Sequence, residues 1–142
     1  MLDRVIDESS EFGERVMRHL RDDVVVWLTT VSRNGEPLPS PVWFLWDGAE
    51  SMLVYSMPSA RIRNLASNAH VSLNFDGDGR GGDIVVLSGT AVEEPESPPA
   101  YANSDYLAKY RASIERIGHT PESFAEKYRV PLRVTIKRIR GH

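Results

Sequence analysis

Alternating apolar and polar positions predict strands along much of this chain. In the segment 70–76, Val71, Leu73 and Phe75 alternate with polar neighbours, which is the period of a strand with one buried face. Runs of β-branched and aromatic residues predict five more strands. These strands are expected at residues 24–31, 39–46, 52–57, 84–92 and 132–137.

Apolar residues three and four positions apart predict four helices around these strands. The helices are expected at residues 9–20, 60–67, 107–117 and 121–128. Asn34-Gly35 and Asp47-Gly48 are typical tight-turn pairs, so the first three strands are expected to form an antiparallel meander. Gly89 interrupts the fifth strand and predicts a bulge or a close approach of another backbone segment.

The order of the elements favours a mainly β protein with flanking helices. Five predicted strands come before residue 95, and the sixth returns near the end of the chain after a helical segment. This order fits a six-stranded antiparallel Greek-key barrel with helices on its outside. At 142 residues, the chain is expected to form one domain over residues 1–142.

Composition and charge argue against several classes of function. The chain has no cysteine, which excludes disulfides and thiol nucleophiles and favours a cytoplasmic location. Its 17 basic and 20 acidic residues give a net charge of −3, so no nucleic-acid partner is expected. No apolar run reaches the length of about 20 residues that spans a membrane, so no membrane partner is expected. The four histidines lack metal-ligand spacing, and no metal site is predicted.

A candidate anion site lies in the segment 55–65, where a predicted strand ends and a predicted helix begins. The segment combines the hydroxyls of Ser56 and Ser59 with the guanidinium groups of Arg61 and Arg63. Free N–H groups and the dipole at a helix N-terminus favour a phosphate. Arg61 is nearer that N-terminus, whereas Arg63 is expected to point to solvent or to a partner chain. The alternative interpretation is a solvated helix with ordinary surface arginines.

The predicted strand 39–46 has no polar face. If Val42, Phe44 and Trp46 fill the barrel, Trp43 and Leu45 point outward and need cover. That cover is one of the chain's own helices, another subunit or a planar ligand.

Six short segments follow one another along the chain in a characteristic order. The segments are Leu28-Thr29-Thr30-Val31, Asn34-Gly35, Pro41-Val42-Trp43-Phe44, the run from Ser59 to Leu65, Val71-Ser72-Leu73 and Gly89-Thr90-Ala91. Taken together, they resemble the pyridoxamine-phosphate-oxidase-like split-barrel family, and the similarity is best over residues 20–95. Within that family, the chain is most similar to the short actinobacterial flavin and deazaflavin oxidoreductases.

The resemblance implies an FMN-binding type of split barrel and a homodimer with a cofactor ring in the groove between two barrels. It matches Arg61 to the family's phosphate-binding Lys or Arg, with Ser56 and Ser59 as nearby hydroxyls. It matches Pro41, Val42 and Trp43 to the strand that lines the ring. The full set of implied cofactor-binding residues is Pro41, Val42, Trp43, Ser56, Ser59, Arg61, Arg63 and Asn64.

The expected function is that of an oxidoreductase. The resemblance implies hydride transfer between a bound deazaflavin coenzyme F(420), or alternatively FMN, and a small organic molecule. Fourteen of the 17 basic residues are Arg, a bias of GC-rich genomes that favours the deazaflavin. The chain ends at residues 137–142 without the family's C-terminal tryptophan motif, so vitamin B6 oxidation is not expected.

Two alternatives remain open from the sequence. One is a non-catalytic protein that binds a flavin, haem or another tetrapyrrole, and the other is a dimeric barrel without a small ligand. The segments 77–82 and 101–128 are candidates for lining the groove. No residue is assigned as a catalytic acid or base.

Overall fold

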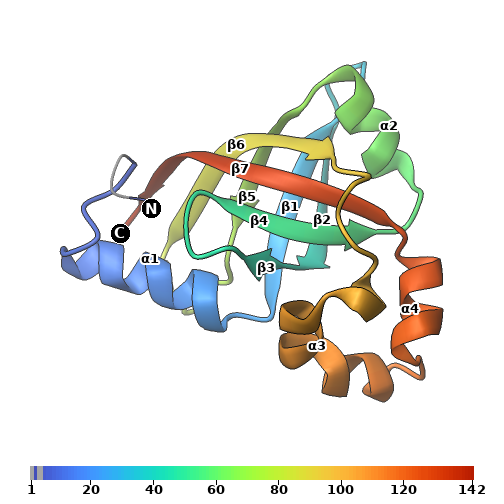
Figure 1. Cartoon of the computed structure of the whole chain (residues 1–142). Coiled ribbons are helices and arrows are strands. Elements are labelled where there is room, and N and C mark those ends of the chain that lie inside the picture. The colour runs from blue at the N-terminus through green and yellow to red at the C-terminus, as the bar shows by residue number, and fades with distance from the viewer. Residues whose placement is uncertain (1, 3–4) are drawn as a thin grey trace.

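A computed structural model of the chain describes residue 2 and residues 5–142 (Figure 1). The helices are α1 (Glu11–Asp22), α2 (Ala60–Ser67), the short 3-10 helix η1 (Ala100–Ala102), α3 (Ser104–Arg116) and α4 (Pro121–Lys127). The strands are β1 (Val25–Val31), β2 (Pro37–Trp43), β3 (Leu45–Trp46), β4 (Ser51–Ser56), β5 (His70–Asn74), β6 (Val85–Glu93) and β7 (Val130–Gly141). In Figure 1, α1 lies beside the chain ends, whereas α3 and α4 lie together on the other side of the sheet.

The strands form one antiparallel sheet that curls into a half-barrel. Their order is β2-β1-β5-β6-β7-β4-β3, so β2 and β3 stand at opposite ends of the sheet. Only Phe44 separates these two strands in the chain. One bent segment therefore pairs with β1 on one side and with β4 on the other. The predicted split-barrel class is confirmed, and the seventh strand arises because the predicted strand 39–46 is broken at Phe44.

Helix α3 satisfies the backbone groups that this break removes from the sheet. The Phe44 N–H donates a hydrogen bond to the Tyr110 hydroxyl (2.9 Å), and Lys109 Nζ donates to the Phe44 carbonyl oxygen (3.0 Å). The Tyr110 hydroxyl donates in turn to the carbonyl oxygen of Val24 (2.6 Å). A buried backbone polar group without a partner is costly, so α3 holds the bend in place.

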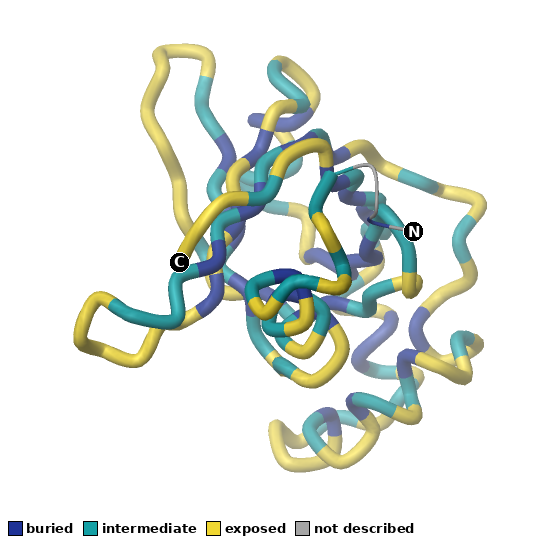
Figure 2. Tube along the Cα trace, turned by 90° about the vertical axis from the view of Figure 1, so that its left-hand side faces the viewer, coloured by how far each residue is buried: buried dark blue, intermediate teal, exposed yellow. Residues whose placement is uncertain are grey.

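Two hydrophobic clusters lie on opposite faces of the bent segment. Val42 and Phe44 belong to the cluster inside the barrel, against which Trp46 also packs. Trp43 and Leu45 pack on the outer cluster, between the sheet and the helices. The predicted alternation is confirmed. The buried residues in Figure 2 follow the strands and the helix sides that face them, and the exposed residues gather in the loops.

Gly89 marks a bulge and a close backbone contact at once. The register between β6 and β7 shifts at Ser88 and Gly89, and a Cβ added to Gly89 would collide with the carbonyl oxygen of Thr135. The bulge and the close backbone approach, which the sequence predicted as alternatives at Gly89, are therefore both present. None of the described helices is long and apolar enough to span a membrane.

Candidate functional site

A cavity of about 340 Å³ opens between the sheet and the helices. It lies where β2 and β4 end, beside the start of α2 and beneath α3 and α4. Its lining residues are Pro41, Val42, Trp43, Tyr55, Ser56, Met57, Arg61, Tyr106, Ile117, Phe124 and Tyr128. The structure thus brings together five of the eight residues that the sequence singled out.

Aromatic rings form one wall of the cavity. Trp43 stacks on Tyr110, with ring centroids 4.7 Å apart and an angle of 6° between the planes. It also stacks on Phe124 at 5.5 Å and 14°. The outward Trp43 is therefore covered by the chain's own helices, one of the three covers expected from the sequence. Stacking on two helix residues fixes the ring as a rigid apolar wall.

A guanidinium group forms the polar end of the cavity. Arg61 Nη1 donates a hydrogen bond to Ser56 Oγ (2.7 Å), and Ser56 Oγ donates to the carbonyl oxygen of Met57 (2.8 Å). Burial lowers the pKa of Arg61 from its usual value, although an arginine remains charged at neutral pH. Within the part of the chain that the structure describes, no carboxylate forms an ion pair with Arg61.

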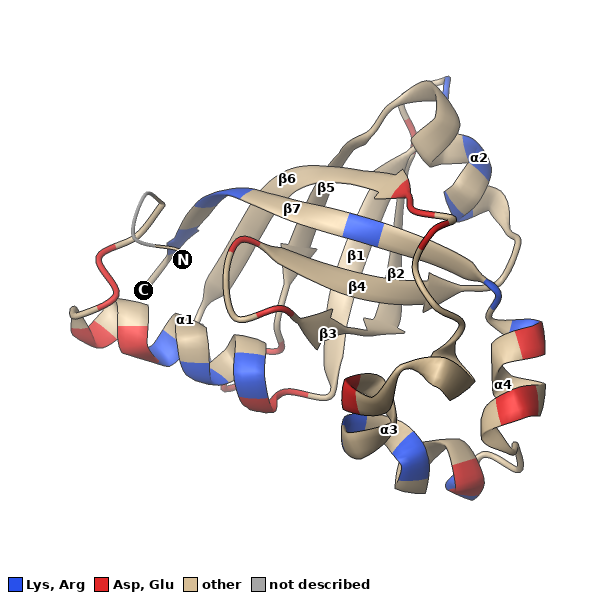
Figure 3. Cartoon of the chain, viewed as in Figure 1, with Lys and Arg blue, Asp and Glu red and all other residues tan. Residues whose placement is uncertain are grey.

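One nitrogen of this guanidinium group and the hydroxyl of Ser59 have no hydrogen-bond partner among the described residues. These two atoms, Arg61 Nε and Ser59 Oγ, are buried. Ser59 is the N-cap of α2, yet its side chain forms no capping bond, and the first turn of the helix holds no acidic residue. Figure 3 shows the basic residues of α2 with no acidic residue on the same helix. Unpaired donors, a positive side chain and a helix N-terminus together fit the oxygens of a phosphate group.

Three residues of the predicted set are not part of the cavity lining: Ser59, described above, Asn64 and Arg63. Asn64 is buried, and its Nδ2 donates to Thr30 Oγ1 (3.0 Å), so its amide joins α2 to β1. Arg63 is exposed on α2, in agreement with its expected orientation toward solvent or a partner. The contribution of either residue to ligand binding stays a prediction.

Several lining residues were not part of the predicted cofactor-binding set. Tyr55 and Met57 lie at the end of β4, within the candidate anion segment 55–65, and Tyr106, Phe124 and Tyr128 come from the helical segment. Of the two candidate lining segments, 101–128 does line this cavity, whereas 77–82 contributes no lining residue. The signal available in the sequence was the apolar outward face of the strand at Trp43, which required cover.

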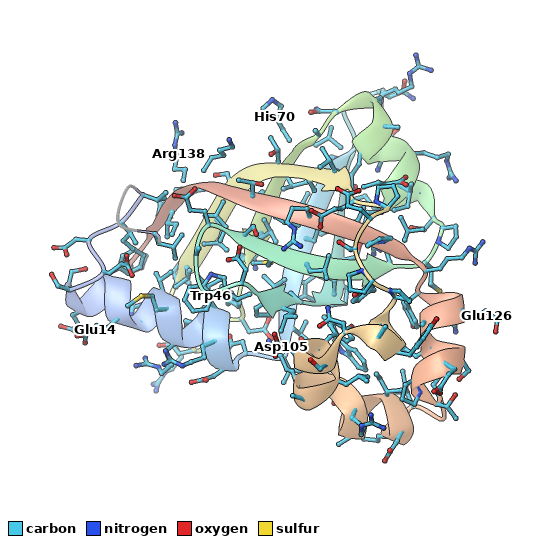
Figure 4. The ribbon with its side chains drawn as sticks, viewed as in Figure 1. Glu14, Trp46, His70, Asp105, Glu126 and Arg138 are labelled. Atoms are coloured by element: carbon cyan, nitrogen blue, oxygen red, sulfur yellow. The ribbon has the colours of Figure 1, made fainter. Side chains whose placement is uncertain are left out.

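No histidine is among the residues that line this cavity, although His119 makes an edge contact with the lining residue Phe124. His70 points away from the sheet in Figure 4, and it is exposed. His19 contacts the carboxylates of Asp23 and Asp83, and His119 contacts Ser123. The candidate site is thus built from aromatic rings, hydroxyls and one guanidinium group.

Comparison with known proteins identifies the family. The sequence profile of the family described as pyridoxamine 5'-phosphate oxidase matches residues 12–142. The chain belongs to this family. No curated protein sequence matches the chain.

Several solved structures have the same split-barrel fold as this chain. An F(420) reductase is 19% identical over 95% of this chain and 98% of its own, with a TM-score of 0.64. An FAD-binding protein from Mesorhizobium loti is 21% identical over 87% and 88%, with a TM-score of 0.62. HutZ, the haem storage protein from Vibrio cholerae, is 16% identical over 92% and 94%, with a TM-score of 0.62. At these identities the similarity shows the fold alone.

Proposed function

We propose that this protein binds a planar, phosphate-bearing redox cofactor of the flavin type in the cavity beside α2. The observation that carries the proposal is the pair of unpartnered donors, Arg61 Nε and Ser59 Oγ, next to an aromatic wall. The protein then acts as an oxidoreductase that moves a hydride to or from a small organic molecule. The family match and the F(420) reductase and FAD-binding neighbours support this proposal.

The chain contributes binding, orientation and exclusion of water. Arg61 and Ser59 hold the phosphate, and Ser56 keeps the guanidinium in position through its 2.7 Å hydrogen bond. Trp43 and the strand from Pro41 orient the ring against an apolar surface. The hydride chemistry belongs to the cofactor when it is bound. No side chain is assigned as an acid or base.

We favour the deazaflavin coenzyme F(420) over FMN as the cofactor. The arginine-rich composition of the chain and the F(420) reductase among its structural neighbours support this choice.

We further propose that two copies of the chain close the groove as a homodimer in the cytoplasm. Two apolar side chains of the cavity lining are exposed in a single copy, Met57 at 39% and Ile117 at 46%. Exposed apolar surface beside a ligand cavity is typical of an interaction surface. The lack of cysteine supports a reducing compartment.

The second candidate function is non-catalytic binding of haem or another tetrapyrrole. It is supported by the similarity to HutZ, a haem storage protein. The same cavity offers apolar walls and a cation, which a tetrapyrrole with carboxylate groups also requires. Turnover distinguishes the two candidates. An oxidoreductase allows an added acceptor, such as a small quinone, to oxidise its reduced cofactor, whereas a storage protein binds without this reaction.

The binding experiment uses the wild type, Arg61→Gln and the matched variant Arg138→Gln. Arg138 is exposed and points away from the sheet in Figure 4. Each protein is titrated with F(420), FMN and haemin, and the bound ligand is read from its absorbance after desalting. Loss of the charge-assisted hydrogen bond that the free Arg61 Nε would donate is expected to weaken the binding of F(420) and FMN to Arg61→Gln by about 10- to 100-fold. An unchanged affinity in a folded Arg61→Gln protein contradicts the phosphate site.

A further inference from the structure

The phenol of Tyr106 is a buried polar group that nothing in the fold uses. The side chain is 0% exposed, and its hydroxyl has no hydrogen-bond partner among the described residues. Burial raises the pKa of Tyr106 far above its usual value of 10, so the phenol keeps its proton and remains a donor. Tyr106 is also one of the residues that line the candidate cavity.

The other two buried tyrosines of the same cluster are fully engaged. The Tyr55 hydroxyl donates to the carbonyl oxygen of Pro98 (2.6 Å) and accepts a hydrogen bond from Asn103 (3.1 Å). The Tyr110 hydroxyl holds the backbone at the strand break. Tyr106 therefore differs from both neighbours, because its hydroxyl stabilises no part of the described structure.

Packing keeps the ring of Tyr106 in its place. Its centroid lies 4.8 Å from that of Tyr55 in an edge contact of 86°, 4.8 Å from Tyr110 and 6.1 Å from Phe124. A ring held on several sides cannot swing out to pair its hydroxyl with bulk water. The cost of the unpaired hydroxyl is therefore retained in the ligand-free protein.

We propose that the Tyr106 hydroxyl is a specificity-determining donor for a ring carbonyl or ring nitrogen of the ligand. This inference rests on the proposed function, since it assumes that the ligand's phosphate lies at Arg61. It requires a planar heterocycle with hydrogen-bond acceptors in the ring itself, as a flavin or a deazaflavin has. A planar anion whose ring lacks acceptors fills the same space but leaves the hydroxyl unpaired.

The binding test compares FMN, which has ring carbonyls, with 1-naphthyl phosphate, which has a phosphate on a ring without acceptors. Tyr106→Phe is expected to weaken FMN about tenfold, the effect of one lost hydrogen bond, and to leave 1-naphthyl phosphate unchanged. Tyr101→Phe removes a hydroxyl from an exposed tyrosine outside the cavity and is the control. Equal FMN affinity in Tyr106→Phe and the wild type overturns the inference. An equal loss for both probes overturns it too, because it indicates a change in shape.

Thermal unfolding of the ligand-free protein tests the same inference without any ligand. Since the hydroxyl has no partner, Tyr106→Phe is expected to melt at the wild-type temperature or up to about 3 °C above it. A midpoint more than about 3 °C below the wild type shows that the hydroxyl has a structural partner and overturns the inference. If the wild type binds neither F(420) nor FMN, the proposed function fails, and the melting comparison still decides whether the hydroxyl is free.

Discussion

Replacing Tyr110 by Phe tests how the barrel is held at the break between β2 and β3. The substitution keeps the ring, and with it the stacking on Trp43 at 4.7 Å, but it removes the hydroxyl. Phe44 then loses the acceptor of its buried N–H (2.9 Å), and Val24 loses the donor to its carbonyl oxygen (2.6 Å). Lys109 still donates to the Phe44 carbonyl oxygen, so that group keeps a partner.

The expected loss of stability follows from these contacts. An unpaired buried donor costs about 1–3 kcal/mol, and a lost hydrogen bond to a carbonyl costs about 1 kcal/mol. Tyr110→Phe is therefore expected to lower the free energy of unfolding by about 2–4 kcal/mol. This is a large part of the roughly 5–15 kcal/mol that stabilises a typical domain. It corresponds to a fall in the melting midpoint of roughly 10 °C.

Urea unfolding followed by tryptophan fluorescence measures this loss, because Trp43 lies on the ring that is changed. The matched variant is Tyr101→Phe, at a tyrosine that is 52% exposed, and it is expected to stay within about 0.5 kcal/mol of the wild type. A Tyr110→Phe protein with the same free energy of unfolding as Tyr101→Phe refutes the argument that the hydroxyl holds the strand break.

Two further predictions concern the barrel away from the cavity. Gly89→Ala is expected to lower the free energy of unfolding by at least about 2 kcal/mol, since its Cβ collides with the Thr135 carbonyl oxygen. A Gly89→Ala protein that is as stable in urea as the wild type would contradict this close contact between β6 and β7. Burial lowers the pKa of His19, but its hydrogen bonds to Asp83 and Asp23 outweigh this and raise the pKa above 6.5. The protonated His19 thus contributes stability that is fully present below about pH 6.5 and is lost as the pH rises through the raised value. His19→Gln is expected to remove this part of the pH dependence, and identical stability profiles between pH 5 and 9 would contradict it.

Much of the barrel is encoded in local patterns that the sequence displays. Alternation predicted correctly that Val42 and Phe44 face the core and that Trp43 faces outward. Gly89 predicted the bulge because a missing side chain is the local requirement for that close contact. Such features depend on neighbouring residues, so a single sequence is sufficient to read them.

The break at Phe44 depends on residues far along the chain and could not be read locally. Its backbone groups are satisfied by Lys109 and Tyr110, and nothing in the strand itself marks the position. The residues of the candidate site also fall into two groups, those that local sequence signals predict and those that depend on distant packing. Arg61 was predicted from the signals of a helix start, whereas the free hydroxyl of Tyr106 follows only from how the helices pack.

We propose that the cavity recognises a phosphate through Arg61 and Ser59. This recognition is measured by the ratio of the dissociation constants of riboflavin and FMN, which differ only in the phosphate, for the wild type and for Arg61→Gln. We predict that the wild type binds FMN about 10- to 100-fold more tightly than riboflavin and that Arg61→Gln loses most of this preference. Equal binding of riboflavin and FMN by the wild type, or an unchanged preference in Arg61→Gln, would contradict it.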